Sequence, residues 1–267
     1  MTRVIPVAEP QARRSGTSSC ESRPVSRRSR IGAPLAFGSH RSVRDDGFYT
    51  EDPMQDQRPE VRMYSDYKSP YAYLAFDPGF ELESKFNVRV RWRPFQLRIK
   101  GKGERSVYSE YKVRYSYLDA RRWANMRPGG LVLKGPLKVY DTTPALIGGL
   151  FAEKHGRLME YSRAVFEKFF RRELEADQAD AVAGVIAALG LPEADYRAYL
   201  AGDGVRDYEA ALAEAAEDHV FGVPMFIFNG EPFWGHDRIG LLERRLTEAG
   251  LAIGGHAAAG VEAARHP

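Results

Sequence analysis

Three short stretches of the chain carry the apolar patterns of strands. Residues 61–63 and 88–95 (VRVRWRPF) alternate apolar with polar side chains, which is typical of a strand with one covered face. Residues 225–228 (MFIF) are apolar throughout, as in a buried strand, and Asn229-Gly230 then predicts a tight hairpin turn into a short fourth strand. The predicted strands therefore lie near the two ends of one folded region, with a long stretch between them.

A helix is expected to begin at Ser69-Pro70, directly after the first strand. A serine hydroxyl at the cap accepts one of the unpaired N–H groups of the first turn, and a proline at the first helical position has no N–H to leave unpaired. Tyr73, Leu74 and Phe76 would then lie on one side of this helix. By itself the Ser-Pro pair indicates only an ordinary helix cap.

Residues from about 108 to 220 predict a block of helices rich in alanine and leucine. Tyr111, Tyr115, Leu118 and Trp123 recur at roughly helical spacing, so we expect them in the core rather than in a binding site. The arginines of the second predicted strand are expected to form a solvated face. Further helices are expected at residues 143–154, 158–172, 179–189, 192–200 and 205–219, and a last one is expected to open at Asp237.

Composition separates the two ends of the chain from its centre. Residues 1–58 are rich in Arg, Ser, Pro and Gly, so they are predicted to be disordered, and residues 251–267 are expected to form a flexible tail. The chain has 267 residues, 43% of them apolar, which is enough material for a sizeable core. No run of about 18 apolar residues suits a membrane span. A formal net charge of +3 gives no ground for nucleic acid as a partner.

The chain has one cysteine, Cys20, in the segment predicted to be disordered. The predicted folded region therefore contains no disulfide and no C-x-x-C pair. Enzymes that exchange disulfides act through a thiolate at the start of a helix, where the helix dipole lowers the pKa of the thiol. Any such chemistry here would need a thiol supplied by a bound molecule.

Three segments carry a resemblance to a known family. They are residues 66–75 (DYKSPYAYLA), 121–124 (RRWA) and 221–238 (FGVPMFIFNGEPFWGHDR). Through them the chain resembles the branch of the DsbA-like thioredoxin superfamily that contains 2-hydroxychromene-2-carboxylate isomerases and kappa-class glutathione transferases. The resemblance implies an α/β protein with a thioredoxin-like fold and an inserted all-helical domain. Residues 59–104 and 221–250 would form the thioredoxin-like domain, and residues 105–220 the insertion.

The same resemblance implies a glutathione site. Ser69 would stand where redox-active relatives carry a cysteine, and its hydroxyl would donate a hydrogen bond to the glutathione sulfur and favour the thiolate. The Val223-Pro224 bond would be cis, so that the Val223 backbone could pair with glutathione as an added strand. In the segment Trp234, Gly235, His236 and Asp237, the helix-start N–H groups would hold the γ-glutamyl carboxylate, and Asp237 its ammonium.

Two further residues are assigned to a substrate site. Lys100 falls near a lysine that contacts substrate in the isomerases, and Tyr140 lies on a run, residues 134–140, that is expected to cross back toward the cleft. Residues 101–109 depart from the loop that the family carries there. This departure leaves the identity of the substrate open, and it bears less on the assignment of the thiol site.

Taken together, the sequence predicts a cytoplasmic, glutathione-dependent isomerase that acts on a small aromatic or chromene-type substrate, without nucleic acid or membrane as a partner. Two alternatives stay open. One is a kappa-like glutathione transferase, and the other is a DsbA-like binding protein without redox activity. Dimers are frequent among the relatives, so a homodimer is compatible with the resemblance, and the oligomeric state stays open.

Overall fold

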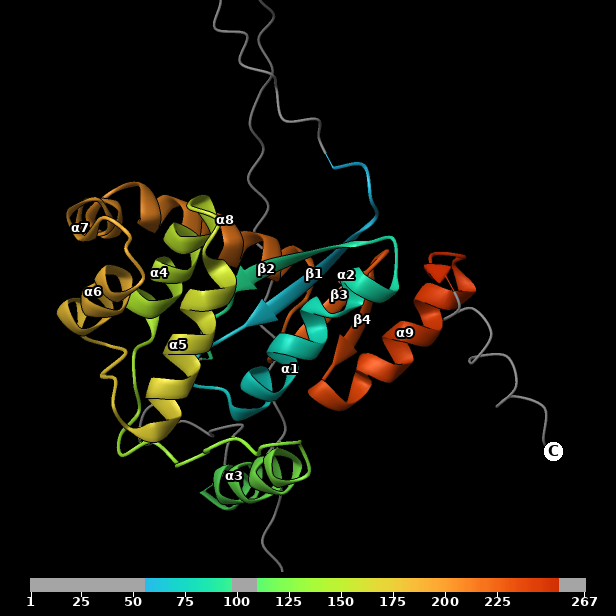
Figure 1. Ribbon diagram of the computed structural model, residues 1–267, viewed down its shortest axis with the longest axis horizontal. Coiled ribbons are helices and arrows are strands. Elements are labelled where there is room, and N and C mark those ends of the chain that lie inside the picture. Colours follow the sequence, from blue (N-terminus) through green and yellow to red (C-terminus); the bar gives the residue numbers. More distant parts are fainter. Residues whose placement is uncertain (1–55, 98–109, 255–267) are drawn as a thin grey trace, which may run out of the picture. The chain divides into compact units, whose positions relative to one another are not determined.

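A four-stranded mixed sheet lies at the centre of the computed structural model, which describes residues 56–97 and 110–254 (Figure 1). The strands are β1 (Glu60–Ser65), β2 (Arg89–Pro94), β3 (Met225–Phe228) and β4 (Glu231–Trp234). Their order is β2-β1-β3-β4, with β1 parallel to β2 and antiparallel to β3. The predicted strands thus form one sheet from the two ends of the folded region.

The hairpin that ends the sheet follows from its turn residues. Asn229 and Gly230 both have positive φ angles, 49° and 79°, the left-handed conformation that a two-residue hairpin turn requires and that these residue types tolerate. All four residues of β3 are buried, as its apolar run predicts. Since Tyr64 pairs with Met225, the end of β1 lies beside Val223 and Pro224, just before β3.

Apolar side chains pack on both faces of the sheet. The larger core cluster includes Val61 and Met63 of β1, together with residues of α1 (Pro70–Phe80) and α9 (Ile239–Glu248). The short helix α2 (Leu82–Lys85) follows α1 and packs near β2. On the opposite face, a smaller cluster joins Tyr64 to Met225 and to Ala215 near the end of α8. The alternation of side chains along β1 therefore supplies both layers.

Among the described residues between β2 and β3, six helices form the block that the sequence predicts. They are α3 (Glu110–Asn125), α4 (Thr143–Lys154), α5 (Leu158–Arg171), α6 (Ala179–Ala188), α7 (Glu193–Ala201) and α8 (Asp203–Glu217). Helix α4 packs against α5, α6, α7, α8 and β2, so eight of its residues are buried. Gly149 permits the approach to β2, because a Cβ there would lie 2.6 Å from the Trp92 ring.

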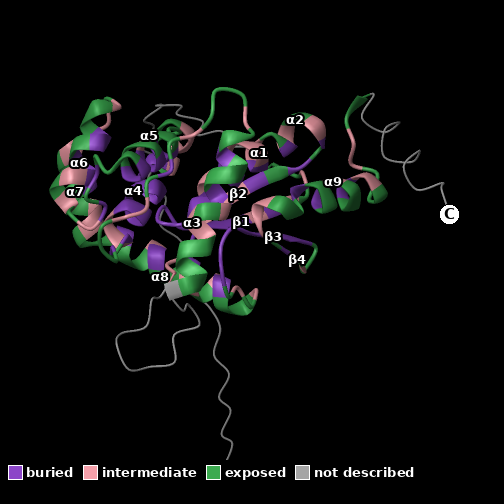
Figure 2. Ribbon diagram, turned by 90° about the horizontal axis from the view of Figure 1, so that it is seen from below, coloured by how far each residue is buried: buried purple, intermediate pink, exposed green. Residues whose placement is uncertain are grey.

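The prediction that the aromatic residues of α3 lie in the core is wrong. Tyr111 is 83% exposed and Tyr115 is 58% exposed, and Leu118 and Trp123 are also exposed. The residues of α3 that are buried are Ala120 and Ala124, on the side that packs against α1. Figure 2 shows the contrast between α3, mainly exposed, and α4, largely buried. A helical period identifies a stripe of apolar residues, but not which stripe meets a neighbour.

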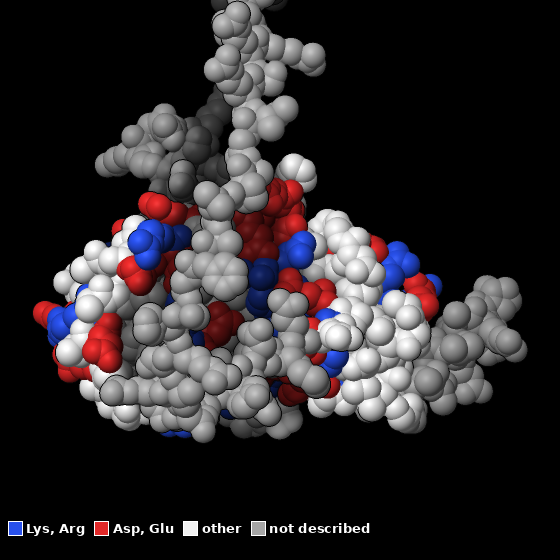
Figure 3. Space-filling view, turned by 90° about the horizontal axis from the view of Figure 1, so that it is seen from above, with Lys and Arg blue, Asp and Glu red and all other residues white. Residues whose placement is uncertain are grey.

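The prediction of a solvated face of arginines on β2 holds for Arg89, which is exposed, but not for the other two arginines. Arg91 and Arg93 are half-buried and form ion pairs with Glu214 of α8, and Arg62 of β1 pairs with Asp218 just after that helix. Figure 3 shows basic and acidic side chains intermingled on one face of the described residues. Helix α8 contributes the acidic partners, which the local pattern of β2 could not reveal.

The ends of the folded region are tied to residues 85–88. The Arg58 guanidinium donates to the Val88 carbonyl at 2.8 Å, and the Asn87 N–H donates to the Leu251 carbonyl at 2.7 Å. The Ile253 N–H, within the segment predicted to be a flexible tail, donates to the Lys85 carbonyl. The rest of the predicted disordered segment and tail lies outside the described residues. None of the helices in residues 56–97 and 110–254 combines the length and the apolar character that a membrane crossing requires.

Candidate functional site

A cavity of about 1030 Å³ lies among the start of α1, helix α3, residues 135–140, the Val223-Pro224 bond and residues 234–238. Its lining includes eight of the nine residues that the sequence singles out, namely Ser69, Tyr140, Val223, Pro224, Trp234, Gly235, His236 and Asp237. Lys100, the ninth, lies outside the described residues. The fold therefore brings residues from four separate parts of the sequence to one space.

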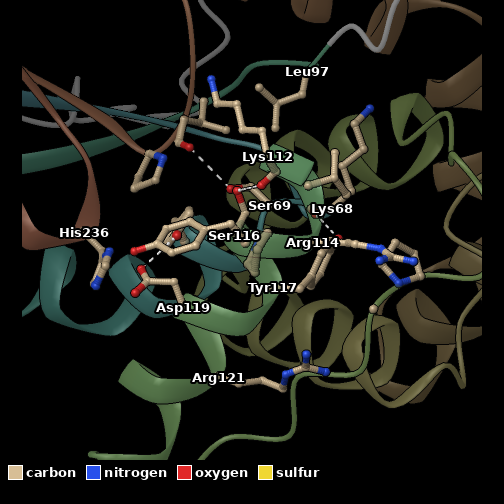
Figure 4. Close-up of a pocket in the computed structure, with 18 of the residues that line it drawn as sticks. Lys68, Ser69, Leu97, Lys112, Arg114, Ser116, Tyr117, Asp119, Arg121 and His236 are labelled. Atoms are coloured by element: carbon tan, nitrogen blue, oxygen red, sulfur yellow. Dashed lines mark hydrogen bonds between the residues drawn. The ribbon is translucent and has the colours of Figure 1, made fainter. Parts of the chain in front are cut away.

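Ser69 stands at the centre of this cavity wall (Figure 4). It is the N-cap of α1, with an extended backbone, and its Oγ accepts from the Ala72 N–H at 3.2 Å. The hydroxyl donates to the Val223 carbonyl at 3.3 Å, across 154 residues of sequence. Ser69 is 3% exposed, so its hydroxyl lies in a water-poor wall where a hydrogen bond to a ligand would be strong.

The Val223-Pro224 peptide bond faces Ser69 and is cis, as the resemblance implies. The Pro224 carbonyl accepts from the Gly235 N–H at 3.0 Å, which holds the start of the 235–238 segment against this corner. The Val223 N–H donates to no other residue that the structure describes. A backbone donor at the edge of the cavity is thus available for an extended ligand.

The carboxylate of Asp66, shortly before Ser69 in the chain, bonds residues from separate segments. Asp66 is fully buried and accepts from the Thr142 hydroxyl and the Leu97 N–H, both at 2.7 Å. The Lys68 Nζ lies 3.3 Å from Asp66 Oδ2, the oxygen that also accepts from the Leu97 N–H, and it donates to the Tyr140 carbonyl at 3.2 Å. These contacts fix the start of α1 to residues 140–142, and so they shape one end of the cavity.

The 234–238 segment takes a form different from a simple helix cap. Gly235 has a φ of 121°, and residues 236–238 form a 3-10 turn before α9 begins at Ile239. Asp237 therefore does not cap α9. Its carboxylate instead accepts from the Arg238 guanidinium at 2.7 Å, and a Cβ on Gly235 would clash with the same carboxylate.

An aromatic cluster closes the cavity at the same end. The His236 ring stacks on Tyr71 with centroids 5.3 Å apart and meets the edge of Trp123 at 4.9 Å. Burial lowers the pKa of His236 below its ordinary value, so the neutral imidazole is favoured. The Tyr71 hydroxyl donates to Asp119 of α3 at 2.9 Å. Burial is the larger cause that raises the pKa of Tyr71, and the bond to Asp119 is the next largest.

Tyr140 lines the cavity, and both its hydroxyl and its carbonyl already have partners within the protein. Its hydroxyl donates to Glu175 at 3.1 Å, and its ring packs on Phe169. Its carbonyl is the group that accepts from Lys68. Burial raises the pKa of the Tyr140 hydroxyl, so it stays protonated at neutral pH.

Sequence reasoning missed several residues that line this cavity, among them Lys68, Tyr71, Asp119 and Trp123. Lys68 and Tyr71 lie within the recognised segment, and a charged residue directly before the cap serine was a signal that could have been used. Trp123 also lies in a recognised segment, residues 121–124, but the helical spacing assigned it to the core. Asp119 carried no such signal, because its relevance depends on where α3 packs.

Comparisons with known proteins point to one group. Residues 60–247 match the DSBA-like thioredoxin domain family. The chain is 27% identical over 191 residues to a 2-hydroxychromene-2-carboxylate isomerase of Pseudomonas putida, which covers 68% of this chain and 92% of that protein. It is 24% identical over 198 residues to the protein of the same name from Sphingobium xenophagum, over 70% of this chain and 98% of that one.

Solved structures agree with these matches. The structure of a 2-hydroxychromene-2-carboxylate isomerase superposes with a TM-score of 0.60 at 26% identity, over 71% of this chain and 95% of that one. A probable DsbA oxidoreductase from Streptomyces coelicolor gives the same TM-score of 0.60 at 19% identity, over 72% of this chain and 89% of that one. The second likeness concerns the fold alone.

Proposed function

Because the chain belongs to the DSBA-like thioredoxin family, with helices inserted into a thioredoxin fold, we propose that it is a glutathione-dependent isomerase of the 2-hydroxychromene-2-carboxylate type. The observation that carries the proposal is the Ser69 hydroxyl, 3.3 Å from the carbonyl of a cis Val-Pro corner in the wall of a large cavity. In redox-active relatives a cysteine holds this place. A serine there can bind a sulfur but cannot exchange disulfides.

The residues around Ser69 fit a bound glutathione. The N–H of Val223 has no partner among the described residues, which suits strand-like pairing with the tripeptide. The backbone N–H groups of His236 and Asp237 open a helical turn and would hold the γ-glutamyl carboxylate. Asp237 would hold the ammonium, in competition with Arg238, to which it is already paired. The cavity, about 1030 Å³, has room for glutathione and a small second molecule.

Ser69 would act as a hydrogen-bond donor. Its hydroxyl now donates to the Val223 carbonyl, and a rotation about the Cβ–Oγ bond would turn the same hydrogen toward a sulfur while Oγ still accepts from Ala72. A hydrogen bond to the thiolate lowers the pKa of the thiol, and each unit of pKa corresponds to about 1.4 kcal/mol in favour of the thiolate. The bound thiol would supply a nucleophile that adds reversibly to an electrophilic carbon of the substrate, permits bond rotation, and leaves unconsumed.

The test is an isomerase assay with 2-hydroxychromene-2-carboxylate, followed by absorbance with and without glutathione. We expect activity that requires glutathione, falls at least tenfold in Ser69→Ala, and stays unchanged in Ser84→Ala. Ser84 is a suitable control because it lies exposed in α2 and its hydroxyl donates to the Glu81 carbonyl of its own helical turn. Full activity of Ser69→Ala, or activity independent of glutathione, would remove the proposed role of Ser69.

The two alternatives give different results in the same samples. A kappa-like transferase would consume glutathione and release a conjugate of higher mass, which mass spectrometry detects. A binding protein without catalysis would leave the substrate unchanged. Titration calorimetry with glutathione separates these cases further, since the isomerase and the transferase both require binding at millimolar ligand or below.

A further inference from the structure

We propose that Arg127 is a positioning residue for the glutathione site, because it fastens the end of helix α3 to a carbonyl of α1 that lacks a donor within its own helix. The proposal deepens the function proposed above and rests on it for the place of glutathione. Arg127 lies just after α3 and is not among the described residues that line the cavity. It acts on the site through the wall that α3 forms.

Pro78 leaves this carbonyl without its helical partner. In an α-helix the N–H of each residue donates to the carbonyl four residues earlier, and a proline has no N–H. Pro78 lies inside α1, so the Leu74 carbonyl lacks that donor. Leu74 is fully buried, and a buried carbonyl without a partner is costly. The packing at this point of α1 therefore requires a donor from another element.

Arg127 supplies that donor. Its guanidinium donates to the Leu74 carbonyl, across 53 residues of sequence. The side chain is half-buried, and burial lowers the pKa of Arg127 below its ordinary value. Asp77, on the same helix as Leu74, pairs with Arg163. The bond from Arg127 is charge-assisted and poorly solvated, and bonds of this kind are stronger than those between neutral, solvated groups.

Arg127 continues the inner face of α3. Asp119, Trp123 and Arg127 follow one another at intervals of four residues, which places them on one side of the helix. The Arg127 N–H donates to the Ala124 carbonyl at 3.2 Å, so the chain still turns helically beyond the end of α3. Helix α3 packs against α1, and its fully buried residues, Ala120 and Ala124, lie among these positions. Small alanines let the two helices approach closely, and Arg127 fixes the far end of the contact.

The same face of α3 reaches the proposed glutathione pocket. Asp119 accepts from the Tyr71 hydroxyl at 2.9 Å, and Trp123 meets the edge of the His236 ring at 4.9 Å. Figure 4 shows Asp119 and His236 on one side of Ser69. His236 opens the turn whose N–H groups would hold the γ-glutamyl carboxylate. The tie at the end of α3 therefore sets how closely Trp123 holds His236 in place.

Titration calorimetry with glutathione tests the tie. We expect Arg127→Met to weaken glutathione binding by roughly tenfold, since a small displacement of a binding wall has effects of this size. The pKa of the bound thiol, followed by the absorbance of the thiolate, should stay unchanged, because Ser69 keeps its place at the start of α1. Arg127→Lys keeps a cationic donor and should retain most of the affinity. Arg122→Met is the matched control, since Arg122 is an exposed arginine of the same helix that does not line the described cavity.

Pro78→Ala is the decisive variant, because it separates the position of α3 from the stability of the fold. It removes a proline from a helix interior and gives residue 78 an N–H that bonds the Leu74 carbonyl. We expect the midpoint of urea unfolding to rise while glutathione binding weakens by about threefold to tenfold, because Arg127 loses its acceptor. In the Pro78→Ala background, Arg127→Met should then have little further effect on binding. A purely structural role predicts instead that stability and affinity change in the same direction.

Two results overturn the proposal. One is that folded Arg127→Met binds glutathione as tightly as the wild type, and the other is that Arg127→Met weakens binding by the same factor with and without Pro78→Ala. If Arg127→Met does not fold, Pro78→Ala decides alone, and an unchanged affinity of that variant overturns the proposal.

Failure of this proposal can be told apart from failure of the proposed function. Wild-type protein that binds no glutathione refutes the proposed function. Hydrogen exchange then still tests the tie, since Arg127→Met and Pro78→Ala should both raise the exchange of amides in residues 119–125, whereas Arg122→Met should not. Unchanged exchange there overturns the inference about Arg127. Wild-type protein that binds glutathione, together with variants of Arg127 and Pro78 that bind it equally well, refutes the inference alone.

Discussion

Asp66 provides a sharp test of what holds the cavity wall together. The carboxylate is fully buried and accepts from the Thr142 hydroxyl, the Leu97 N–H and the Lys68 N–H, at 2.7, 2.7 and 3.2 Å. It also lies 3.3 Å from the Lys68 ammonium. The change to alanine would leave a buried cation without its partner and several donors unsatisfied.

The magnitude follows from these contacts. Breaking a buried ion pair by removal of one partner costs about 3–5 kcal/mol, and we expect Asp66→Ala to lower the free energy of unfolding by about 4 kcal/mol. Most of that loss is the cost of the stranded Lys68 ammonium. The double variant Asp66→Ala/Lys68→Met should therefore be more stable than Asp66→Ala alone, by about 2 kcal/mol.

Urea unfolding followed by circular dichroism measures both values. Asp77→Ala is the control, because Asp77 lies on α1, the helix that follows Asp66, and pairs with Arg163 at 2.8 Å, with side chains 46% and 56% exposed. An exposed pair of this kind contributes about 1 kcal/mol or less. A loss below about 1 kcal/mol for Asp66→Ala, or a double variant less stable than the single one, would refute the reasoning about a stranded cation.

Two further changes test the 234–238 segment. Gly235→Ala should destabilise the protein by about 1–3 kcal/mol and weaken glutathione binding, because the φ angle of Gly235 is 121° and the new Cβ would meet Asp237. Gly240→Ala in α9 is the control, because a Cβ there would lie in open space. His236 has a lowered pKa, so its contribution to stability is present above the unfolded pKa of about 6.5 and is lost as pH falls toward the folded pKa. The thermal midpoint of the wild type should therefore fall more between pH 7.5 and pH 5 than that of His236→Phe; equal falls would contradict the role of the half-buried imidazole.

Local chemistry made the element boundaries predictable. The cap at Ser69-Pro70, the turn at Asn229-Gly230 and the helix from Thr143 to Lys154 all appear where the sequence predicts them. Each depends on neighbours within a few residues, whose preferences act in any fold. Most of the residues that the sequence assigned to the site and that line the cavity lie in the recognised segments around Ser69 and Trp234.

Tertiary structure decided which residues meet. The bond from Ser69 to Val223 and the contacts of Asp66 with Thr142 join residues far apart in the chain, and no local pattern specifies such distances. The exposed aromatic residues of α3 were misassigned for the same reason, since burial depends on the partner surface as well as on the helix period.

The sequence by itself determined the order of strands and helices, the absence of a cysteine at the start of α1, and the membership of the chain in its family, because these reside in residue types and short spacings. The three-dimensional packing alone decided that Lys68 becomes a buried cation beside Ser69 and that α3 forms one wall of the cavity. Burial and charge pairing arise only when distant segments come together, so they cannot be derived from any one of those segments.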